Sequence, residues 1–110
     1  QGEATRALLE IERVIKINPT AQAWFLRGRA YFDLESWTEA EDDFRRATLT
    51  DPQFHDARGA IGYVKIARGD LEGAAQAFRT TLRFSPDNEA AQQNLKLVEK
   101  ELAKRPIPPN

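Results

Sequence analysis

The chain has 110 residues, 41% of them hydrophobic, which suits one domain with its own core. Its 16 Lys and Arg against 17 Asp and Glu give a net charge of −1, so no general attraction to nucleic acid or acidic membranes is expected. The absence of cysteine excludes disulfides, thiolate catalysis and cysteine-ligated metals. No apolar run approaches the roughly 18 residues of a membrane span, and we expect no direct membrane contact. The sequence does not indicate a cellular compartment, since cytoplasm and periplasm are equally compatible with this composition.

Apolar residues recur at intervals of three and four along most of the chain, which predicts amphipathic helices. The strict alternation that is typical of strands is absent from the sequence, so we expect an all-α protein. The predicted helices span residues 4–17, 21–34, 37–49, 55–68, 71–84 and 89–103.

The breaks between the predicted helices carry capping residues or proline. Ser36 and Glu39 fit a capping box, and Asp70 is predicted to cap a later helix in the same place. Acidic residues early in the 37–49 helix and basic residues late in it complement the helix dipole, so we interpret this charge cluster as exposed surface. The cluster comprises Glu39, Glu41, Asp42, Asp43, Arg45 and Arg46. Three breaks hold an X-Pro pair: Asn18-Pro19, Asp51-Pro52 and Ser85-Pro86.

A single internal period, close to the length of one helix pair, organises the chain. Three prolines recur at this period, and an alanine precedes each of them at the same spacing. A bulky apolar side chain lies one helical turn after each alanine, and two glycines one period apart complete the pattern. The repeating positions are Ala7, Ala40 and Ala74; Ile11, Phe44 and Phe78; Pro19, Pro52 and Pro86; and Gly28 and Gly62. Such a period indicates stacked helix pairs, because one pair alone leaves an apolar face uncovered.

This pattern resembles the tetratricopeptide repeat, a helix–turn–helix unit of about 34 residues. The unit at 20–53 matches the family at Trp24, Gly28, Tyr31, Ala40, Phe44, Ala47 and Pro52, whereas Arg27 replaces the usual leucine. The next unit departs at the positions equivalent to Trp24, Tyr31 and Ala47, which are Arg58, Lys65 and Thr81. The resemblance implies an antiparallel helix-pair solenoid of about six helices in a right-handed superhelical stack.

The resemblance divides the chain into five segments. Residues 1–19 hold the second helix of a truncated first repeat, and 20–53 and 54–87 are complete repeats. Residues 88–104 form a polar C-terminal capping helix, of the kind that such arrays need for solubility. Residues 105–110 form a proline-rich tail that cannot continue a helix. We therefore expect a fragment of a larger tetratricopeptide scaffold.

The first predicted helix lacks the companion helix that the repeat implies. Ala7, Ile11 and Val14 would pack on that companion, so we expect them to be partly uncovered. One interpretation, which we favour, is that the chain comes from a longer array. In the other, a second copy covers these residues and forms a homodimer.

Catalysis is not expected. His55 is the only histidine, and its place near a helix start favours a surface or capping role. The sequence has no nucleophile elbow, no Cys/His cluster for a metal and no phosphate-binding glycine loop. We therefore predict no enzyme activity, no cofactor and no metal.

The family resemblance implies a concave groove, lined by the first helix of each repeat, that binds a peptide or a partner helix. Helical phase assigns groove positions on the helices 21–34, 55–68 and 89–103. These positions are Gln22, Phe25, Leu26, Arg29, Asp56, Ala60, Tyr63, Gln93, Asn94 and Leu97. Packing between helices is the alternative for Phe25 and Tyr63, and Phe32 and Ile66 are left undecided.

We therefore predict a protein–protein interaction module whose partner is a protein or peptide. The alternative is a structural module that self-associates through its open N-terminal face. Chaperone-tail binders of this family clamp a terminal carboxylate with Lys, Asn and Arg, but Phe25, Leu26, Gly59 and Ala60 occupy such places here. An apolar groove instead favours a ligand with a bulky apolar side chain. The sequence lacks the basic stripe of an RNA-binding helical repeat, so nucleic acid is not an expected partner.

Overall fold

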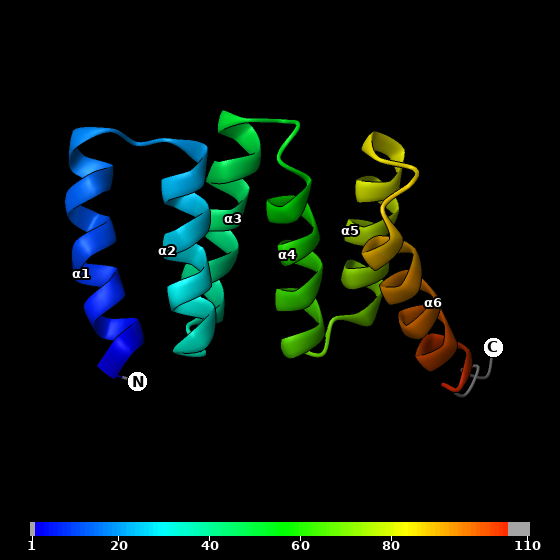
Figure 1. Ribbon diagram of the computed structural model, residues 1–110. Coiled ribbons are helices and arrows are strands. Elements are labelled where there is room, and N and C mark those ends of the chain that lie inside the picture. Colours follow the sequence, from blue (N-terminus) through cyan, green and yellow to red (C-terminus); the bar gives the residue numbers. More distant parts are fainter. Residues whose placement is uncertain (1, 106–110) are drawn as a thin grey trace.

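Six helices follow one another along the chain and are joined by short connections (Figure 1). The computed structural model describes residues 2–105, and within them there is no strand. The helices are α1 (Gly2–Ile17), α2 (Ala21–Asp33), α3 (Trp37–Thr50), α4 (His55–Ala67), α5 (Leu71–Phe84) and α6 (Glu89–Ala103). These bounds agree closely with the predicted helices, and the all-α fold class is confirmed.

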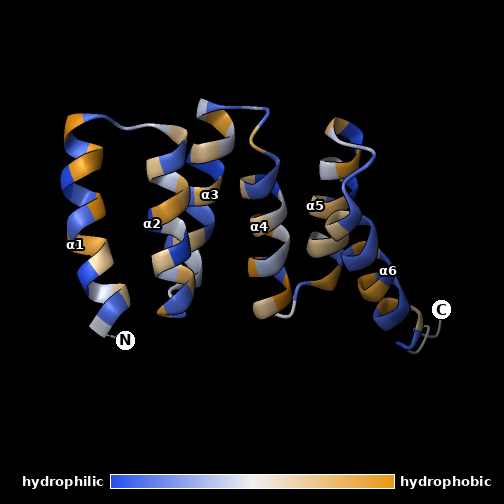
Figure 2. Cartoon of the chain, viewed as in Figure 1, coloured by the Kyte–Doolittle hydropathy of each residue, from blue (hydrophilic) through white to orange (hydrophobic). Residues whose placement is uncertain are grey.

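Consecutive helices run antiparallel and pack on one another, so the molecule is elongated, with extents of 53 × 29 × 23 Å. In Figure 1, α3 and α5 lie behind the row formed by α2, α4 and α6. Each helix carries both hydrophilic and hydrophobic positions (Figure 2), as expected where one face packs and the other meets solvent. No helix within residues 2–105 is long and apolar enough to cross a membrane. The predicted proline-rich tail, apart from Arg105, lies outside the described residues.

Two glycines allow the paired helices to approach closely. A Cβ atom on Gly28 would lie 2.6 Å from the ring of Phe44, and one on Gly62 would lie 2.6 Å from the ring of Phe78. Both phenylalanine side chains are almost completely buried. The ring of the second helix therefore fills the space that a side chain on the first helix would need.

The core consists of two hydrophobic clusters in which alanines surround one large ring. The first cluster joins α3 to α4 and comprises Ala40, Phe44, Ala60 and Val64. The second joins α5 to α6 and comprises Ala74, Ala75, Phe78, Ala91 and Val98. Each cluster thus links one helix pair to the next helix along the chain, which explains why the pairs stack.

Two alanine substitutions on α4 should change stability in opposite directions. Gly62→Ala should lower the free energy of unfolding by about 1 kcal/mol, because overlap with the Phe78 ring outweighs the better helix propensity of alanine. A Cβ atom on Gly59 would have no neighbouring atom within 4 Å, so Gly59→Ala should raise it by about 1 kcal/mol. Urea denaturation measures both variants. Equal effects of the two substitutions would contradict the close packing at Gly62.

The predicted helix caps differ in outcome. Asp70 caps α5 as predicted, because its Oδ1 atom accepts a hydrogen bond from the Gly73 amide at 2.8 Å. The capping box predicted for Ser36 and Glu39 is wrong, since the Ser36 side chain makes no cap hydrogen bond. The backbone is nearly the same at both sites, with φ −87° and ψ 77° at Ser36 and φ −92° and ψ 80° at Asp70. The difference lies in the side chain, because the carboxylate reaches one atom farther than the hydroxyl.

The charge cluster of α3 was expected to be exposed surface, and this is wrong for two of its carboxylates. Asp43 is completely buried and accepts hydrogen bonds from Arg27 Nε and Nη2, at 2.7 and 2.9 Å, and from Arg46 Nη1 at 2.7 Å. The hydrogen bond to Asp43 raises the pKa of Arg27. Both guanidinium groups also face the Trp24 ring, 5.2 and 5.4 Å from its centroid. The arginine that replaces the usual leucine of the repeat is therefore the partner of a buried aspartate.

Glu41, the second buried carboxylate, connects α3 to α4. It pairs with Arg45 of its own helix, with Lys65 Nζ at 3.2 Å and with Arg68 Nη1 at 3.8 Å. Burial opposes the charged form of Glu41, but hydrogen bonds from Arg45 and Lys65 outweigh burial, so the pKa of Glu41 is lowered. Lys65, which stands where the preceding unit has a tyrosine, thus supplies an ion pair between the helix pairs α2–α3 and α4–α5.

Stability should fall with acidification in a way that depends on Glu41. Its folded-state pKa lies below the unfolded value of about 4.3, so its ionised form stabilises the fold above that pH, and this contribution is lost as the pH falls through the folded-state pKa. Glu41→Gln should therefore be less stable than the wild type at neutral pH and lose less stability between about pH 6 and pH 3. Urea denaturation at several pH values measures this slope. Glu39→Gln, at an exposed position of the same helix, should keep the wild-type slope. A wild-type slope in Glu41→Gln would show that the carboxylate is not ion-paired.

α1 packs on α2 and contains no buried residue. Ala7 and Ile11 are half-buried, and Val14 is 52% exposed. These three side chains are thus partly uncovered, as the sequence indicates. Self-association through them stays a prediction.

Candidate functional site

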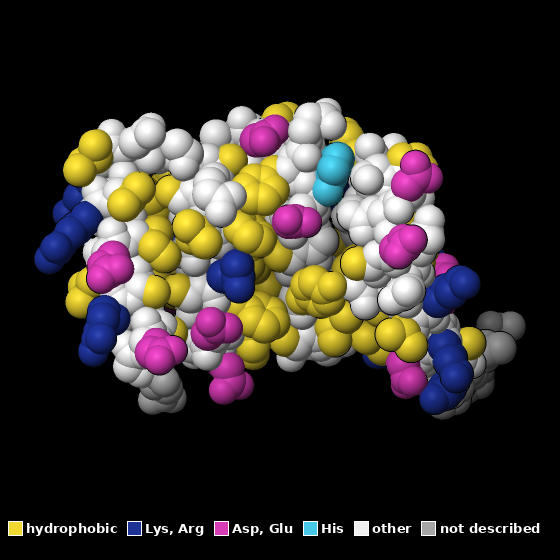
Figure 3. All heavy atoms as spheres, viewed as in Figure 1, with side chains coloured by type: hydrophobic (Ala, Val, Ile, Leu, Met, Phe, Trp, Pro, Cys, Tyr) yellow, Lys and Arg dark blue, Asp and Glu magenta, His cyan; other side chains and the backbone are white. Residues whose placement is uncertain are grey.

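A groove of about 610 Å³ crosses α2, α4 and α6 on one face of the molecule (Figure 3). Its walls come from these three helices, and buried side chains of α3 and α5, including Phe44, Phe78 and Thr81, form its floor. In Figure 3, hydrophobic side chains form a band across this face. The volume lies in the range that is typical of ligand-binding pockets in proteins.

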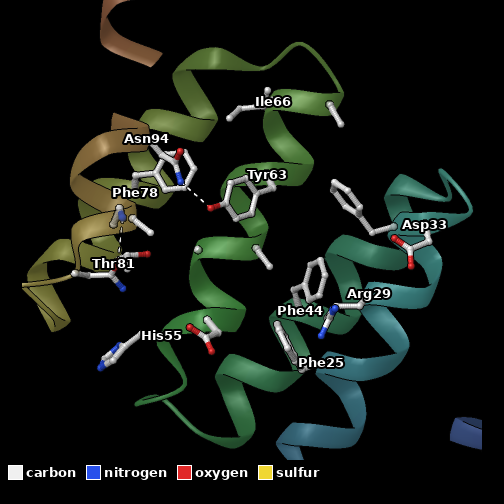
Figure 4. Close-up of a pocket in the computed structure, with 18 residues that line it drawn as sticks. Phe25, Arg29, Asp33, Phe44, His55, Tyr63, Ile66, Phe78, Thr81 and Asn94 are labelled. Carbon is white, nitrogen blue, oxygen red and sulfur yellow. Dashed lines mark hydrogen bonds between the residues drawn. The ribbon is translucent and has the colours of Figure 1, made fainter. Parts of the chain in front are cut away.

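Aromatic side chains of α2 form one wall of the groove (Figure 4). The Phe25 ring lies 5.7 Å from the Phe44 ring and 4.9 Å from the Phe54 ring, centroid to centroid. The Phe32 ring stands edge-on to Trp37 at 5.0 Å. Phe25 and Phe32 therefore pack against neighbouring rings and line the groove at the same time, so the two interpretations that the sequence set against each other coexist.

α4 supplies the centre of the groove, where small and large residues lie side by side. Gly59 and Ala60 keep this part open, and the space beside Gly59 is free of atoms within 4 Å of a Cβ position. Tyr63 is 43% exposed and stacks edge-on against Phe78 at 5.7 Å. Ile66, 39% exposed, continues the apolar surface about one turn farther along the helix.

α6 forms the opposite wall and is tied to α4 across the groove. Asn94 Nδ2 donates a hydrogen bond to the Tyr63 hydroxyl oxygen at 2.7 Å (Figure 4). The Tyr63 hydroxyl keeps its own proton and can donate it to a ligand. Ala90 and Ala91 also line this wall, and Asn88 caps α6 by accepting a hydrogen bond from the Ala91 amide.

Besides Tyr63, four ionisable side chains line the groove: Arg29, Asp33, His55 and Asp56. Among residues 2–105, none of the four has an ion-pair partner within 4 Å. Arg29 lies over the Phe25 ring, 5.9 Å from its centroid. No three His, Cys, Asp or Glu side chains of the described part are grouped as a metal site requires.

The structure places six of the ten predicted groove positions in this lining: Phe25, Arg29, Asp56, Ala60, Tyr63 and Asn94. The other four lie outside it: Gln22, Leu26, Gln93 and Leu97. The prediction gave every concave position equal weight, but a groove needs a helix on both sides. Leu26 and Gln93 are each rotated by about 100° around their helices from the lining residues Phe25 and Asn94. Gln22 and Leu97 share the helical phase of the lining but lie about one turn beyond it, before Phe25 and after Asn94. Contact of any of these residues with a partner stays a prediction.

Several lining residues were not assigned from the sequence. Asp33 follows Arg29 by about one helical turn, so its place on the same face of α2 was available from helical spacing. His55, expected to be a surface or capping residue, is half-buried at the edge of the groove near the start of α4 (Figure 4). The floor residues Phe44 and Phe78 come from other helices, and their repeat positions indicate core packing alone.

A second hollow, of about 480 Å³, lies between α3, α4 and α5. Its cationic side chains already have partners within the protein. Arg58 Nη2 donates to the Pro52 carbonyl at 2.7 Å, and burial lowers the pKa of Arg58. Arg45 and Lys65 both pair with Glu41. This hollow therefore offers a ligand less free polar chemistry than the groove across α2, α4 and α6.

The tetratricopeptide repeat family matches the sequence over residues 1–53 and 28–89. The two matches together cover more than half of the chain, so the protein belongs to the tetratricopeptide repeat family. The helix-pair solenoid that the sequence predicts is the fold of this family, and that prediction is confirmed.

Several known proteins share sequence with this chain. Sperm-associated antigen 1 of Mus musculus is 31% identical over 103 residues, which are 92% of this chain and 11% of that protein. Small glutamine-rich tetratricopeptide repeat-containing protein 2 of Mycosarcoma maydis is 25% identical over 92 residues, 83% of this chain and 26% of that protein. Bacteriophage adsorption protein A of Escherichia coli is 27% identical over 105 residues, 96% and 11% of the two chains. The chain thus spans about a quarter or less of these relatives.

Solved structures superpose closely on the fold. The first tetratricopeptide domain of Spaghetti (RPAP3), bound to the HSP90 peptide SRMEEVD, has a TM-score of 0.85 and 25% identity over 94% of this chain and 83% of its own. The second such domain of human RPAP3, in complex with the HSP70 peptide SGPTIEEVD, has a TM-score of 0.80 and 29% identity over 89% and 82% of the two chains. MamA has a TM-score of 0.84 and 22% identity over 91% of this chain and 59% of its own. At this identity the match supports the fold alone.

Proposed function

We propose that this chain is a protein–protein interaction module that binds a short peptide or helix of a partner in the groove across α2, α4 and α6. The observation that carries the proposal is the groove itself, an apolar and solvent-open surface with polar groups at fixed positions. Tyr63 and Ile66 expose large apolar areas at its centre, and a contiguous exposed patch of this kind is typical of an interaction site. Two domains of the same fold were solved with peptides, which supports a peptide ligand.

Each wall of the groove has a role in this proposal. An apolar side chain of the ligand enters above Gly59 and Ala60, between the rings of Phe25 and Tyr63. The Tyr63 hydroxyl and Asn94, already joined at 2.7 Å, offer hydrogen bonds to the ligand backbone. No catalytic role is proposed, because the family assignment and the groove both favour binding.

A variant that fills the groove tests this function. Peptides selected from a phage-displayed random library against the wild type are labelled, and their affinity is measured by fluorescence anisotropy. Gly59→Leu should weaken their binding by about tenfold or more, because leucine occupies the open space at the centre of the groove. Thermal unfolding should show a stability equal to or above that of the wild type, since leucine is the better helix former.

Leu49→Ala provides the matched control. Leu49 is 81% exposed on α3 and lies outside the groove, so its removal should leave peptide affinity unchanged. Selected peptides that bind Gly59→Leu as tightly as the wild type would contradict the proposed site. Light scattering tests the alternative of self-association through α1. A molecular mass that rises with protein concentration in the wild type, but stays at the monomer value in Val14→Asp, would support that alternative instead.

A further inference from the structure

We infer that the groove selects a partner segment in which a bulky apolar side chain is flanked by Lys or Arg, and that it rejects acidic chain ends. This inference rests on the proposed function, because it concerns the ligand of the same groove. Its basis is the charge of the lining, in which two carboxylates without ion-pair partners outnumber one guanidinium group.

Apart from His55, the acidic and basic side chains of the groove are two carboxylates and one guanidinium group. Asp33 and Asp56 are exposed, and neither has an ion-pair partner within residues 2–105. They differ in this respect from the buried Asp43 and Glu41, whose charges are neutralised by arginine and lysine. The guanidinium group of Arg29 faces the Phe25 ring. The unpaired groups that a ligand meets are therefore mainly negative, and no lysine lines the groove among the described residues.

The two carboxylates lie toward opposite ends of the groove. Asp33 ends α2 and Asp56 lies in the first turn of α4, and these two helices run in the same direction (Figure 1). One repeat period places Asp56 of α4 level with Gln22 of α2. Asp33 follows Gln22 by 11 residues, so the two carboxylates are about 16 Å apart along the helix axes. An extended chain covers that length in about five residues. Basic residues on both sides of one apolar anchor would therefore match the carboxylates, while the anchor fills the space over Ala60.

Acidic chain ends fit this groove poorly. The HSP90 and HSP70 peptides held by the two RPAP3 domains both end in EEVD, which has three acidic side chains and a terminal carboxylate. In this groove such a segment would meet two unpaired aspartates and a single arginine. Like charges placed side by side oppose binding, and this opposition provides selectivity. The partner class we infer is therefore a basic and apolar segment.

The composition of selected peptides tests the inference. Random peptides displayed on phage and enriched on the wild-type protein should show more Lys and Arg, and less Asp and Glu, than the input library. Asp33→Asn and Asp56→Asn should each weaken the selected peptides by about two- to fivefold, and added salt should weaken binding to the wild type more than to the variants. Asp42→Asn, an exposed carboxylate of α3 outside the groove, should leave affinity unchanged. The peptide SRMEEVD should not bind at concentrations that saturate a selected peptide.

The outcomes separate this inference from the function on which it rests. Enrichment of acidic or uncharged peptides whose binding is lost in Gly59→Leu would overturn the charge preference and leave the groove as the site. If the peptide SRMEEVD binds saturably to the wild type and not to Gly59→Leu, the charge preference is likewise overturned and the groove remains the site. Peptides that bind equally to the wild type and to Gly59→Leu would overturn the proposed function as well.

Discussion

Asp43→Ala should lower the free energy of unfolding by about 3 kcal/mol or more, because it leaves a largely buried arginine without its counter-charge. The Asp43 carboxylate takes two hydrogen bonds from Arg27 and one from Arg46, and its side chain is fully buried. The Arg27 side chain is only 19% exposed, so water replaces the lost carboxylate poorly. Urea denaturation of the wild type and the variant measures the loss.

Replacing both partners gives the matching control. The double variant Arg27→Leu, Asp43→Leu should unfold within about 1 kcal/mol of the wild type, since apolar side chains remove the buried charges together. Leucine is also the usual residue of the repeat at position 27. A loss below about 1 kcal/mol in the single variant Asp43→Ala would show that water reaches this ion pair, which would contradict the burial of Asp43.

Phe44→Ala should cost about 3–5 kcal/mol of stability, because the ring is almost completely buried between α2 and α4. Its ring fills the space opposite Gly28 and packs against the Phe25 ring, so its removal leaves a cavity between α2, α3 and α4. The loss is a large part of the roughly 5–15 kcal/mol that is typical of a domain. Urea or thermal denaturation measures it.

Phe84→Ala is the matched control for Phe44→Ala. Phe84 ends α5, is 49% exposed and lies 4.1 Å from the Arg58 guanidinium group. Losing this partly exposed contact should cost about 1 kcal/mol. Similar losses in the two variants would contradict the assignment of Phe44 to the core.

The groove and the core share side chains, and this constrains how binding can be tested. Phe25 packs on Phe44 and Phe54 while it lines the groove, so its removal would reduce both stability and ligand contact. Gly59 has no such double role, because the space beside it is empty. Filling that space separates ligand binding from folding more clearly than removing an aromatic ring does.

The helices and their stacking could be predicted from the sequence because they depend on local spacing. Apolar residues at intervals of three and four set the six helices. The internal period marks Gly28, Phe44, Gly62 and Phe78 as repeating positions. The structure shows that each glycine lies against the phenylalanine ring of its own helix pair. A side-chain cap was harder to predict. Ser36 and Asp70 stand at equivalent turns, but only the aspartate reaches the amide of the following helix.

The burial of charges could not be predicted from one helix at a time. The sequence of α3 places Glu41 and Asp43 early in a polar stretch, where helix dipole effects alone account for them. Their partners Arg27 and Lys65 lie on α2 and α4, and the contact exists only when the three helices pack. Ion pairs of this kind need the distances of the folded chain.

By itself, the sequence determined the six helices, the repeat and the family, because each of these follows from residue spacing along the chain. It also determined which face of α2 and α4 carries Phe25, Arg29 and Tyr63. Only the tertiary structure decided which concave positions line the groove, because that depends on how α2 and α6 approach α4; Leu26 and Leu97 share the concave side but lie outside the lining. It also decided that Asp33 joins the predicted Asp56 in the lining and that neither has an ion-pair partner in the described residues, because that depends on how α2, α4 and α6 stand beside one another.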